Sequence, residues 1–377
     1  MPWRASAMSE LRLAFVHQVA TLRVPMSRAC VQFGISRKTG YKWLQRFQMQ
    51  PTGPLLEQSR RPKNSPARAS DEQEQRVLEV RRQYGWGARK IHAYLTNQGT
   101  ALPSLRTVHQ ILVRHGAVSA AVEPPPATQS FERAEPNQLW QCDHKGALEI
   151  ARQKVYPLTI IDDHSRYLFP LRACLNVTMR TAFDVLWDVF GEFGLPESLL
   201  CDNAFGTNFR VPKTPSWFDS QLIRLGIRPV HGRPYHPQTQ GKVERLHGTF
   251  EREVWPRVRR DTIAHFEQDV NHWRSEVYNS IRPHESLGDQ PPLARFRPSP
   301  RRRPDCVPEV SYDVGAVVRK VSGSGEIYWK GYRILAGTGI IGQRVRIEDR
   351  GHEVAVFYAW KEIRTLAAQE MHRQNQL

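Results

Sequence analysis

The spacing of apolar residues changes twice along the chain, and each change predicts a different kind of structure. As far as residue 118, apolar residues recur every three or four positions, which is the period of an amphipathic helix. Residues 137–296 instead mix short β-branched and aromatic runs with helical stretches. In residues 310–360, apolar and polar residues alternate in short runs that glycine-containing turns separate. The pattern predicts N-terminal helical units, a central α/β domain and a C-terminal unit that we interpret as a small five-stranded β-barrel.

The N-terminal helices predict two helix-turn-helix units, at residues 1–50 and 71–122. In the first unit, Gly34 suits the end of a short helix, Ser36 suits the cap of the next, and Tyr41 is expected to be buried. The exposed side of that next helix is basic, with Arg37, Lys38, Lys42 and Arg46. Such a helix is typical of one that enters a DNA major groove, and a plain helical bundle with a solvated basic face is the alternative.

The second helical unit has a weaker turn signal, at Gly87, and its last helix is expected to expose Arg106 and His109. We predict that Arg106 also contacts DNA. A purely structural role for this unit would leave the same pattern.

The central domain, residues 137–296, is predicted to hold a mixed five-stranded sheet covered by helices. Its strands are expected at Leu139–Asp143, Val155–Asp162, Tyr167–Cys174, Ser198–Asp202 and Ile227–Val230. Proline-rich or basic linkers are expected at residues 51–70, 123–136 and 297–309, and a tail at residues 361–377.

Charge and cysteine usage narrow the class of protein. The net charge is +17 and the isoelectric point is near 10.0, which indicates a polyanionic partner. Residues 1–70 hold 12 Lys and Arg against two acidic residues. The five cysteines are widely spaced, which argues against a disulfide framework or a zinc finger and fits a reducing compartment. No apolar run approaches the roughly 18 residues of a membrane span, so we expect a cytoplasmic protein.

Three carboxylates are the main candidates for chemistry. Asp143 and Asp202 each follow a cysteine at the polar end of a short apolar strand, so the cysteines should face the core while the aspartates line the other face. Glu244 falls in the first turns of a later helix. Three adjacent carboxylates repel one another unless a cation neutralises them. Oxygen ligands without a His or Cys cluster favour Mg²⁺ or Mn²⁺, and two such ions can promote in-line displacement at phosphorus.

Four motifs resemble the integrase-type DDE transposases of bacterial insertion sequences. They are Leu139-Trp140-Gln141-Cys142-Asp143, Ile161-Asp162-Asp163-His164-Ser165-Arg166, Cys201-Asp202-Asn203 and the run from Pro234 to Arg245, PYHPQTQGKVER. The segment Asn279–Leu287, NSIRPHESL, also fits the family. The resemblance implies a retroviral-integrase-like catalytic core of the ribonuclease H-like type, with Asp143, Asp202 and Glu244 as its metal-binding triad. The interval from Asp202 to Glu244 is a few residues longer than is usual in the family, and residues 205–216 can hold the extra length as a loop.

Other polar residues in or near these motifs are further candidates for a role in the site. Asp162 and Asp163 are rival carboxylates, and we expect them to be structural, with Asp163 pairing Arg166. His236, Lys242 and Arg245 are expected to contact DNA near the triad, although His236 could instead only shape its loop.

The resemblance implies a transposase that binds the inverted-repeat ends of a mobile element, cleaves 3′ ends and transfers them into target DNA. Its partners would be double-stranded DNA and further copies of the chain, as a dimer or larger assembly, with no membrane and no small-molecule substrate. Such a protein would work in the bacterial cytoplasm, associated with the nucleoid through DNA. The alternatives are a DNA-binding regulator or domesticated protein whose core no longer joins DNA, and a nuclease without strand transfer.

Overall fold

The structure is a computed structural model that describes residues 5–52, 55–57, 69–118, 132–202, 214–232 and 241–367. The chain divides into two compact units, Met1–Arg68 and Ala69–Leu377. None of the helices within those ranges is long and apolar enough to cross a membrane.

The first unit contains three helices around a small apolar core. They are α1 (Ala5–Ala20), α2 (Met26–Gln32) and α3 (Arg37–Met49). Gly34 has a φ of 63° after α2, and Ser36 accepts a hydrogen bond from the Thr39 amide at 3.2 Å, so the predicted turn and cap are confirmed. The prediction that Tyr41 is a core residue is wrong, because Tyr41 is 59% exposed, whereas Trp43, a further candidate for the core, is buried. The two positions differ by about 200° around a helix, so they do not face the same core.

The larger unit begins with three helices that pack around Trp86, Ile91 and Ile111. They are α4 (Asp71–Tyr84), α5 (Ala88–Asn97) and α6 (Leu105–Arg114). Ser70 and Gln73 form a reciprocal capping box at the start of α4. We call α4, α5, α6 and their connections the second helical unit.

The central sheet is mixed, as predicted, but the described residues form six strands in it rather than five. They are β1 (Trp140–His144), β2 (Leu148–Ile150), β3 (Gln153–Asp162), β4 (Arg172–Cys174), β5 (Ser198–Cys201) and β6 (Arg228–His231). The strand order is β2-β3-β1-β5-β6, and β4 also pairs with β3. β3 runs antiparallel to β1, whereas β5 runs parallel to β1 and to β6.

Two details of the predicted sheet are wrong. The predicted first strand is followed, after residues 145–147, by β2, which pairs with the other half of β3 and was not expected. Of the predicted third strand, only β4 is formed. Leu168, in its first half, makes an isolated bridge to Ile161, and the Asn279 side chain forms hydrogen bonds with the backbone N–H and C=O of Leu168.

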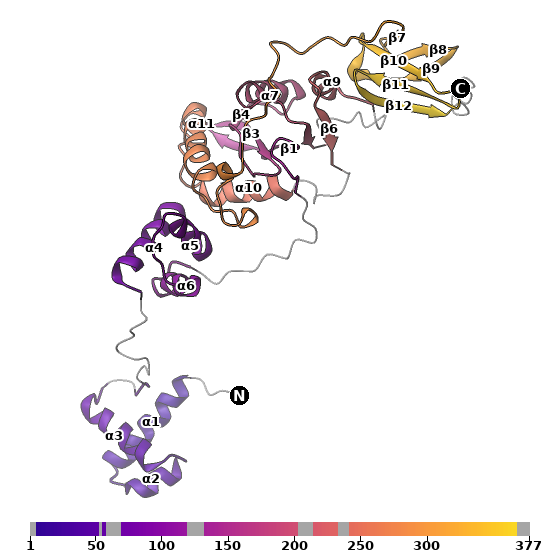
Figure 1. The fold of residues 1–377 in the computed structure, drawn as a ribbon. Coiled ribbons are helices and arrows are strands. Elements are labelled where there is room, and N and C mark those ends of the chain that lie inside the picture. Colours follow the sequence, from indigo (N-terminus) through magenta and orange to yellow (C-terminus); the bar gives the residue numbers. More distant parts are fainter. Residues whose placement is uncertain are drawn as a thin grey trace. The chain divides into compact units, whose positions relative to one another are not determined.

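Helices cover both faces of the sheet (Figure 1). They are α7 (Met179–Phe193), α9 (Trp217–Arg224), α10 (Gly241–Glu253) and α11 (Ile263–His272), followed by a π-helical turn (Trp273–Asn279) and short 3-10 turns (Glu285–Leu287 and Pro292–Ala294). α7 and α9 share a core with Cys142 and Cys201, whereas α10 packs through Val243 and Leu246 against Ile161. The main apolar core therefore packs on one face of the sheet, and α10 lies against the other.

Residues 297–309 were expected to form a linker, but they are bound along the α/β core. Arg301 donates to the Pro196 carbonyl at 2.6 Å and the Gly226 carbonyl at 2.9 Å. Arg303 donates to the Trp187 carbonyl at 3.0 Å, and its guanidinium lies 4.5 Å from the centre of the Trp187 ring. The arginines thus have backbone partners, which their charge alone does not reveal.

The C-terminal part is all-β and holds six strands rather than the five predicted. They are β7 (Val317–Lys320), β8 (Glu326–Trp329), β9 (Tyr332–Leu335), β10 (Arg344–Asp349), β11 (Glu353–Tyr358) and β12 (Lys361–Ala367), with a 3-10 turn at Thr338–Ile340. The described strands pair as an antiparallel sheet, β12-β11-β10-β7, and a separate β8–β9 hairpin. A closed barrel stays a prediction. β12 occupies residues that had been assigned to the tail.

Candidate functional site

Asp143 and Asp202 occupy matching positions near the C-terminal ends of two neighbouring strands. β1 and β5 are parallel, and Cys142 and Cys201 are direct partners in their register. The next residue on each chain is therefore an aspartate, at a strand separation of about 4.8 Å. Both cysteines are 1% exposed and belong to the core shared with α7, as the alternation of side chains predicts. Burial raises the pKa of the Cys201 thiol well above its usual value, so it is an inert core group.

Glu244 is placed by the way α10 lies on the sheet. It is exposed in the first turn of the helix, next to the buried Val243. One turn later, His247 Nε2 lies 2.9 Å from Thr159 Oγ1. Thr159 is the register partner of Asp143 and donates to the Asp143 carbonyl at 2.9 Å. The side of α10 that carries Glu244 and His247 therefore faces the strand that carries Asp143.

A second contact on that side of α10 fixes the rotation of the helix. Glu251, one further turn along, accepts a hydrogen bond from Lys145 Nζ at 2.7 Å. The spacing of Glu244, His247 and Glu251 places all three on one side of a helix. Sequence reasoning missed His247, Glu251 and Lys145, although this spacing was a usable signal.

Electrostatics connect the three acidic residues of the predicted triad. The pKa of Asp143 is raised to about 6, first by burial and then by the negative charges of Asp202 and Glu244, against a lowering hydrogen bond from the His144 backbone. Burial and the two negative charges each disfavour an unneutralised carboxylate at this position. A bound divalent cation would offset these three effects.

The donor set suits a hard cation. Asp143, Asp202 and Glu244 offer carboxylate oxygens, and the two neighbouring thiols face the opposite side of the sheet. Within the described parts of the chain, no three His, Cys, Asp or Glu side chains already converge closely enough to hold a metal ion. The topology thus places Asp143 and Asp202 at neighbouring positions near the ends of β1 and β5, and the side of α10 that carries Glu244 faces them.

The rival carboxylates are structural. Asp162 and Asp163 are both 0% exposed. Asp162 accepts from the Asn137 amide at 2.8 Å and from the Ser165 amide at 2.7 Å. Asp163 accepts from the Gln141 amide group at 2.7 Å and forms an ion pair with Lys242. Their oxygens are occupied by protein donors.

Two predictions for the neighbouring cations change as a result. Arg166 does not pair with Asp163 but with Glu132, at 2.7 Å. The oxygens of Asp163 are already taken by Gln141, Lys242 and the Arg133 amide. Lys242, expected to contact DNA, extends inward and also donates to the Asp163 carbonyl at 3.2 Å. Burial lowers the pKa of its ammonium, against the effect of Asp163.

The remaining DNA-contact candidates differ in how free they are to reach a partner. Arg37 and Lys38 are exposed in the first turn of α3. Lys42 and Arg46 lie further along the same helix and pair with Glu57 at 2.8 Å and 3.5 Å.

The candidates outside α3 lie near the start of α6 and beside the triad. Arg106 is exposed near the start of α6, and Arg245 is exposed beside Glu244. His236 lies outside the described residues.

Comparisons with known proteins match the two parts that carry these candidates. Two models described as integrase core domain match residues 133–237 and 225–292, and a homeodomain-like domain model matches residues 39–112. A solved structure of the human T-cell lymphotropic virus HTLV-2 integrase catalytic core domain in complex with magnesium is similar at 15% identity and a TM-score of 0.32, covering 43% of this chain and 97% of that one. A simian T-cell lymphotropic virus intasome in complex with PP2A regulatory subunit B56 gamma is similar at 17% identity and a TM-score of 0.36, covering 78% of this chain and 99% of that one.

Proposed function

Because the chain contains an integrase core domain and a homeodomain-like domain, as the resemblance to integrase-type DDE transposases led us to expect, we propose that it is a transposase. It binds the inverted-repeat ends of a mobile DNA element and catalyses metal-dependent 3′-end cleavage and strand transfer into target DNA. The observation that carries this proposal is the placement of Asp143 and Asp202 at adjacent ends of parallel strands, electrostatically coupled to Glu244 on α10.

In this proposal Asp143, Asp202 and Glu244 hold Mg²⁺ or Mn²⁺, as two ions. When bound, such ions would supply activation of the attacking water or 3′-hydroxyl and stabilisation of the charge at phosphorus. The chain's own part is to hold three carboxylates in place. β1 and β5 fix the two aspartates, and the contacts of His247 and Glu251 fix the rotation of α10 and hence of Glu244.

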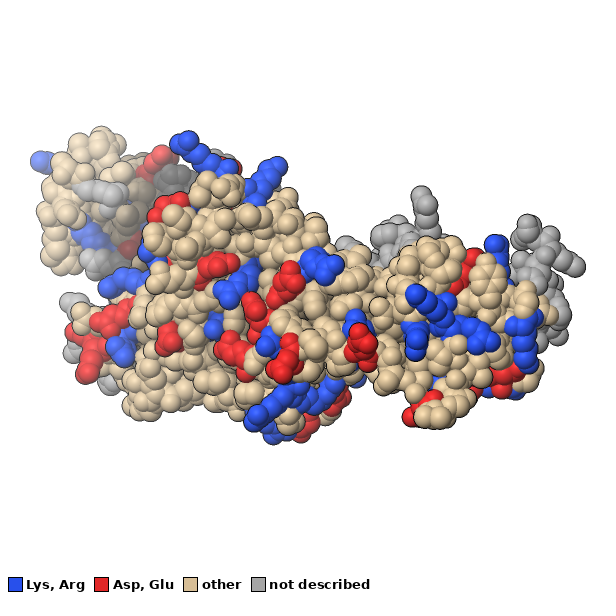
Figure 2. Space-filling model, turned by 90° about the horizontal axis from the view of Figure 1, so that it is seen from above, with Lys and Arg blue, Asp and Glu red and all other residues tan. Residues whose placement is uncertain are grey.

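DNA contact is proposed for basic residues that remain exposed. Arg37 and Lys38 stand at the start of α3, the end of a recognition helix that contacts bases in helix-turn-helix proteins. Arg106 and Arg245 are placed to contact phosphates, whereas Lys42, Arg46 and Lys242 would first have to leave their acidic partners. His236 is proposed on the sequence alone. Figure 2 shows further Lys and Arg side chains gathered over the C-terminal strands.

Two element ends must be joined in one reaction, so we propose that the protein acts on double-stranded DNA as a homodimer or larger assembly in the bacterial cytoplasm. The domain divisions at residues 50, 70, 122, 136 and 309 are part of this proposal. Those at residues 296 and 360 are left out, because residues 297–309 are bound along the core and β12 extends the C-terminal strands to Ala367. The alternative function is that of a regulator or domesticated protein that binds DNA without joining it.

The test uses the purified full chain, a duplex carrying the inverted repeats that flank its gene, a second plasmid as target, and Mg²⁺ or Mn²⁺. Joined products support the transposase. Cut ends without joining indicate a nuclease, and a mobility shift without any cleavage indicates a DNA-binding protein; either outcome contradicts the proposal.

A further inference from the structure

The last residue of α10 is the centre of a buried cluster of charged and polar side chains. The Glu253 side chain is 9% exposed and that of its partner Arg282 is 6% exposed. Arg282 donates through Nε and Nη2 to both Glu253 oxygens, each at 3.0 Å. This bidentate geometry is the strong form of an arginine–carboxylate contact.

The second helical unit supplies two more partners to the same carboxylate. Trp86 Nε1 donates to Glu253 at 3.1 Å, and Lys90 Nζ lies 3.4 Å from it. Burial would raise the pKa of Glu253, but the hydrogen bonds and charge of Arg282, with smaller contributions from Lys90 and Trp86, hold it below its usual value. Glu253 is therefore an anion whose partners come from two separate parts of the fold.

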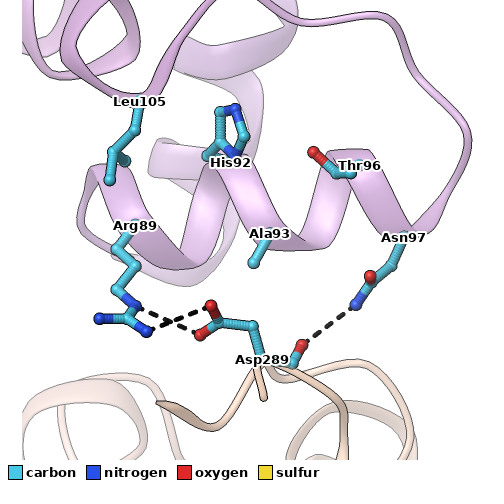
Figure 3. A pocket seen from close by; sticks show the side chains of 7 residues that line it. All are labelled: Arg89, His92, Ala93, Thr96, Asn97, Leu105 and Asp289. Carbon is cyan, nitrogen blue, oxygen red and sulfur yellow. Dashed lines mark hydrogen bonds and ion pairs between the residues drawn. The ribbon is translucent and has the colours of Figure 1, made fainter.

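Apolar and exposed polar contacts surround this cluster. Val277 and Ile281 pack against the core of the second helical unit. Figure 3 shows the outer layer, where Arg89 on α5 pairs with Asp289 at 3.3 Å and Asn97 donates to the Asp289 carbonyl at 3.1 Å. Exposed ion pairs add little stability, but these fix the register between α5 and the segment after the π-helical turn.

The cluster lies on the helix that carries Glu244. Glu253 is nine residues further along α10, which corresponds to roughly 13 Å and half a turn around the helix. Lys242, which pairs with Asp163, shares the side of α10 that carries Glu253, and Glu244 is on the other side with His247 and Glu251. The contacts of Glu253 therefore connect the second helical unit to the helix that holds Glu244.

We infer that Glu253 is a positioning residue, through which DNA bound by the second helical unit sets the placement of Glu244. The inference rests on the proposed function for its consequence in catalysis, but the physical coupling does not depend on it. It also gives a role to the segment Asn279–Leu287: Asn279 anchors Leu168, Arg282 binds Glu253, and Glu285 pairs with Arg89 at 2.6 Å.

The coupling itself is tested by hydrogen exchange on the full chain without DNA. Glu253→Gln should raise exchange in both α5 and α10, and Arg282→Lys should give the same pattern more weakly. The matched control is Glu79→Gln, which breaks an exposed ion pair with Arg76 on α4 and should change neither helix. If Glu253→Gln raises exchange in α10 but leaves α5 unchanged, the coupling does not exist. If it unfolds the chain, Arg282→Lys decides.

The consequence for catalysis is tested by comparing cleavage of a full inverted-repeat duplex with cleavage of a duplex cut back to its terminus. The wild-type protein should cleave the full duplex faster, and Glu253→Gln should reduce the ratio of the two rates by about 5-fold or more, the usual lower range of coupling between sites. Glu79→Gln should keep the wild-type ratio. If Glu253→Gln slows both reactions equally, Glu253 is only structural and the inference fails. If the wild-type protein cleaves neither duplex, the proposed function fails instead, and the exchange experiment still decides the coupling.

Discussion

Replacing Arg282 with methionine leaves the Glu253 carboxylate buried without its bidentate partner. The pair is at most 9% exposed on either side chain, so water cannot replace the two lost hydrogen bonds. Breaking one side of such a pair typically costs 3–5 kcal/mol. Because Lys90 remains 3.4 Å from Glu253 and is itself one-third exposed, we expect a loss near the lower end, about 3 kcal/mol at neutral pH.

The double variant Glu253→Gln with Arg282→Met shows whether the loss of stability in Arg282→Met comes from the unpaired charge of Glu253 or from lost packing of the arginine side chain. Glutamine still accepts the hydrogen bond of Trp86 Nε1 and carries no charge, so the double variant should be more stable than Arg282→Met alone. The pH dependence of this stabilisation follows from the lowered pKa of Glu253. The stabilisation is present above the pKa of glutamate in the unfolded chain and is lost as the pH falls through the pKa of Glu253 in the folded protein.

The assay is urea unfolding of the full chain followed by circular dichroism, with the midpoint compared at an unchanged slope. Arg259→Met is the control, because it removes an exposed ion pair with Asp269 and should shift the midpoint little. The reasoning is refuted if Arg282→Met is as stable as the wild type, or if the double variant is no more stable than Arg282→Met.

Three other predictions concern separate parts of the chain. Gly40→Ala should destabilise the first unit by about 1–3 kcal/mol, because the added Cβ would come within 2.9 Å of three side-chain atoms of α1 and α2. Gly87→Ala meets nothing within 4 Å and should be tolerated, and limited proteolysis would detect the difference. His284→Gln should reduce the loss of stability between pH 6.5 and 4.5. Burial and nearby positive charge lower the pKa of His284 to about 2, whereas the unfolded side chain takes up a proton below about pH 6.5, and this difference costs the wild type up to roughly 1.4 kcal/mol per pH unit. An equally steep loss of stability in thermal melts of the variant would contradict this. Arg37→Gln should reduce the salt dependence of DNA binding by about one ion, whereas Lys42→Gln should reduce it less because Lys42 already pairs with a glutamate; equal slopes in a salt titration would contradict the assigned difference.

Local chemistry was enough to predict the start of the site. The residue pairs Cys142-Asp143 and Cys201-Asp202 end apolar runs, and the alternation of side chains along a strand then separates the core face from the polar face. The cap at Ser36 follows from a hydroxyl side chain that accepts a backbone amide of the first helical turn. These features depend on neighbours in the sequence, which is why they could be predicted.

Long-range pairing could not be predicted in the same way. Lys242 looks like an exposed cation from its own segment, and only the packing of α10 brings it to Asp163, 79 residues earlier. From its own segment, Glu253 looks like a solvent-facing helix residue. In the folded chain, Trp86 and Arg282, which are distant in sequence, form hydrogen bonds with it. The choice of partner for a charged side chain is a property of the assembled core, and the local sequence does not contain it.

The central claim is that Asp143 binds the catalytic metal. The most direct test is the cleavage and joining of inverted-repeat DNA by Asp143→Asn, beside Asp184→Asn, which removes an exposed carboxylate of α7 in the same domain. The account predicts that Asp143→Asn binds DNA like the wild type but gives neither cut nor joined product in Mg²⁺ or Mn²⁺, while Asp184→Asn remains active. Cleavage by Asp143→Asn at the wild-type rate would contradict the account.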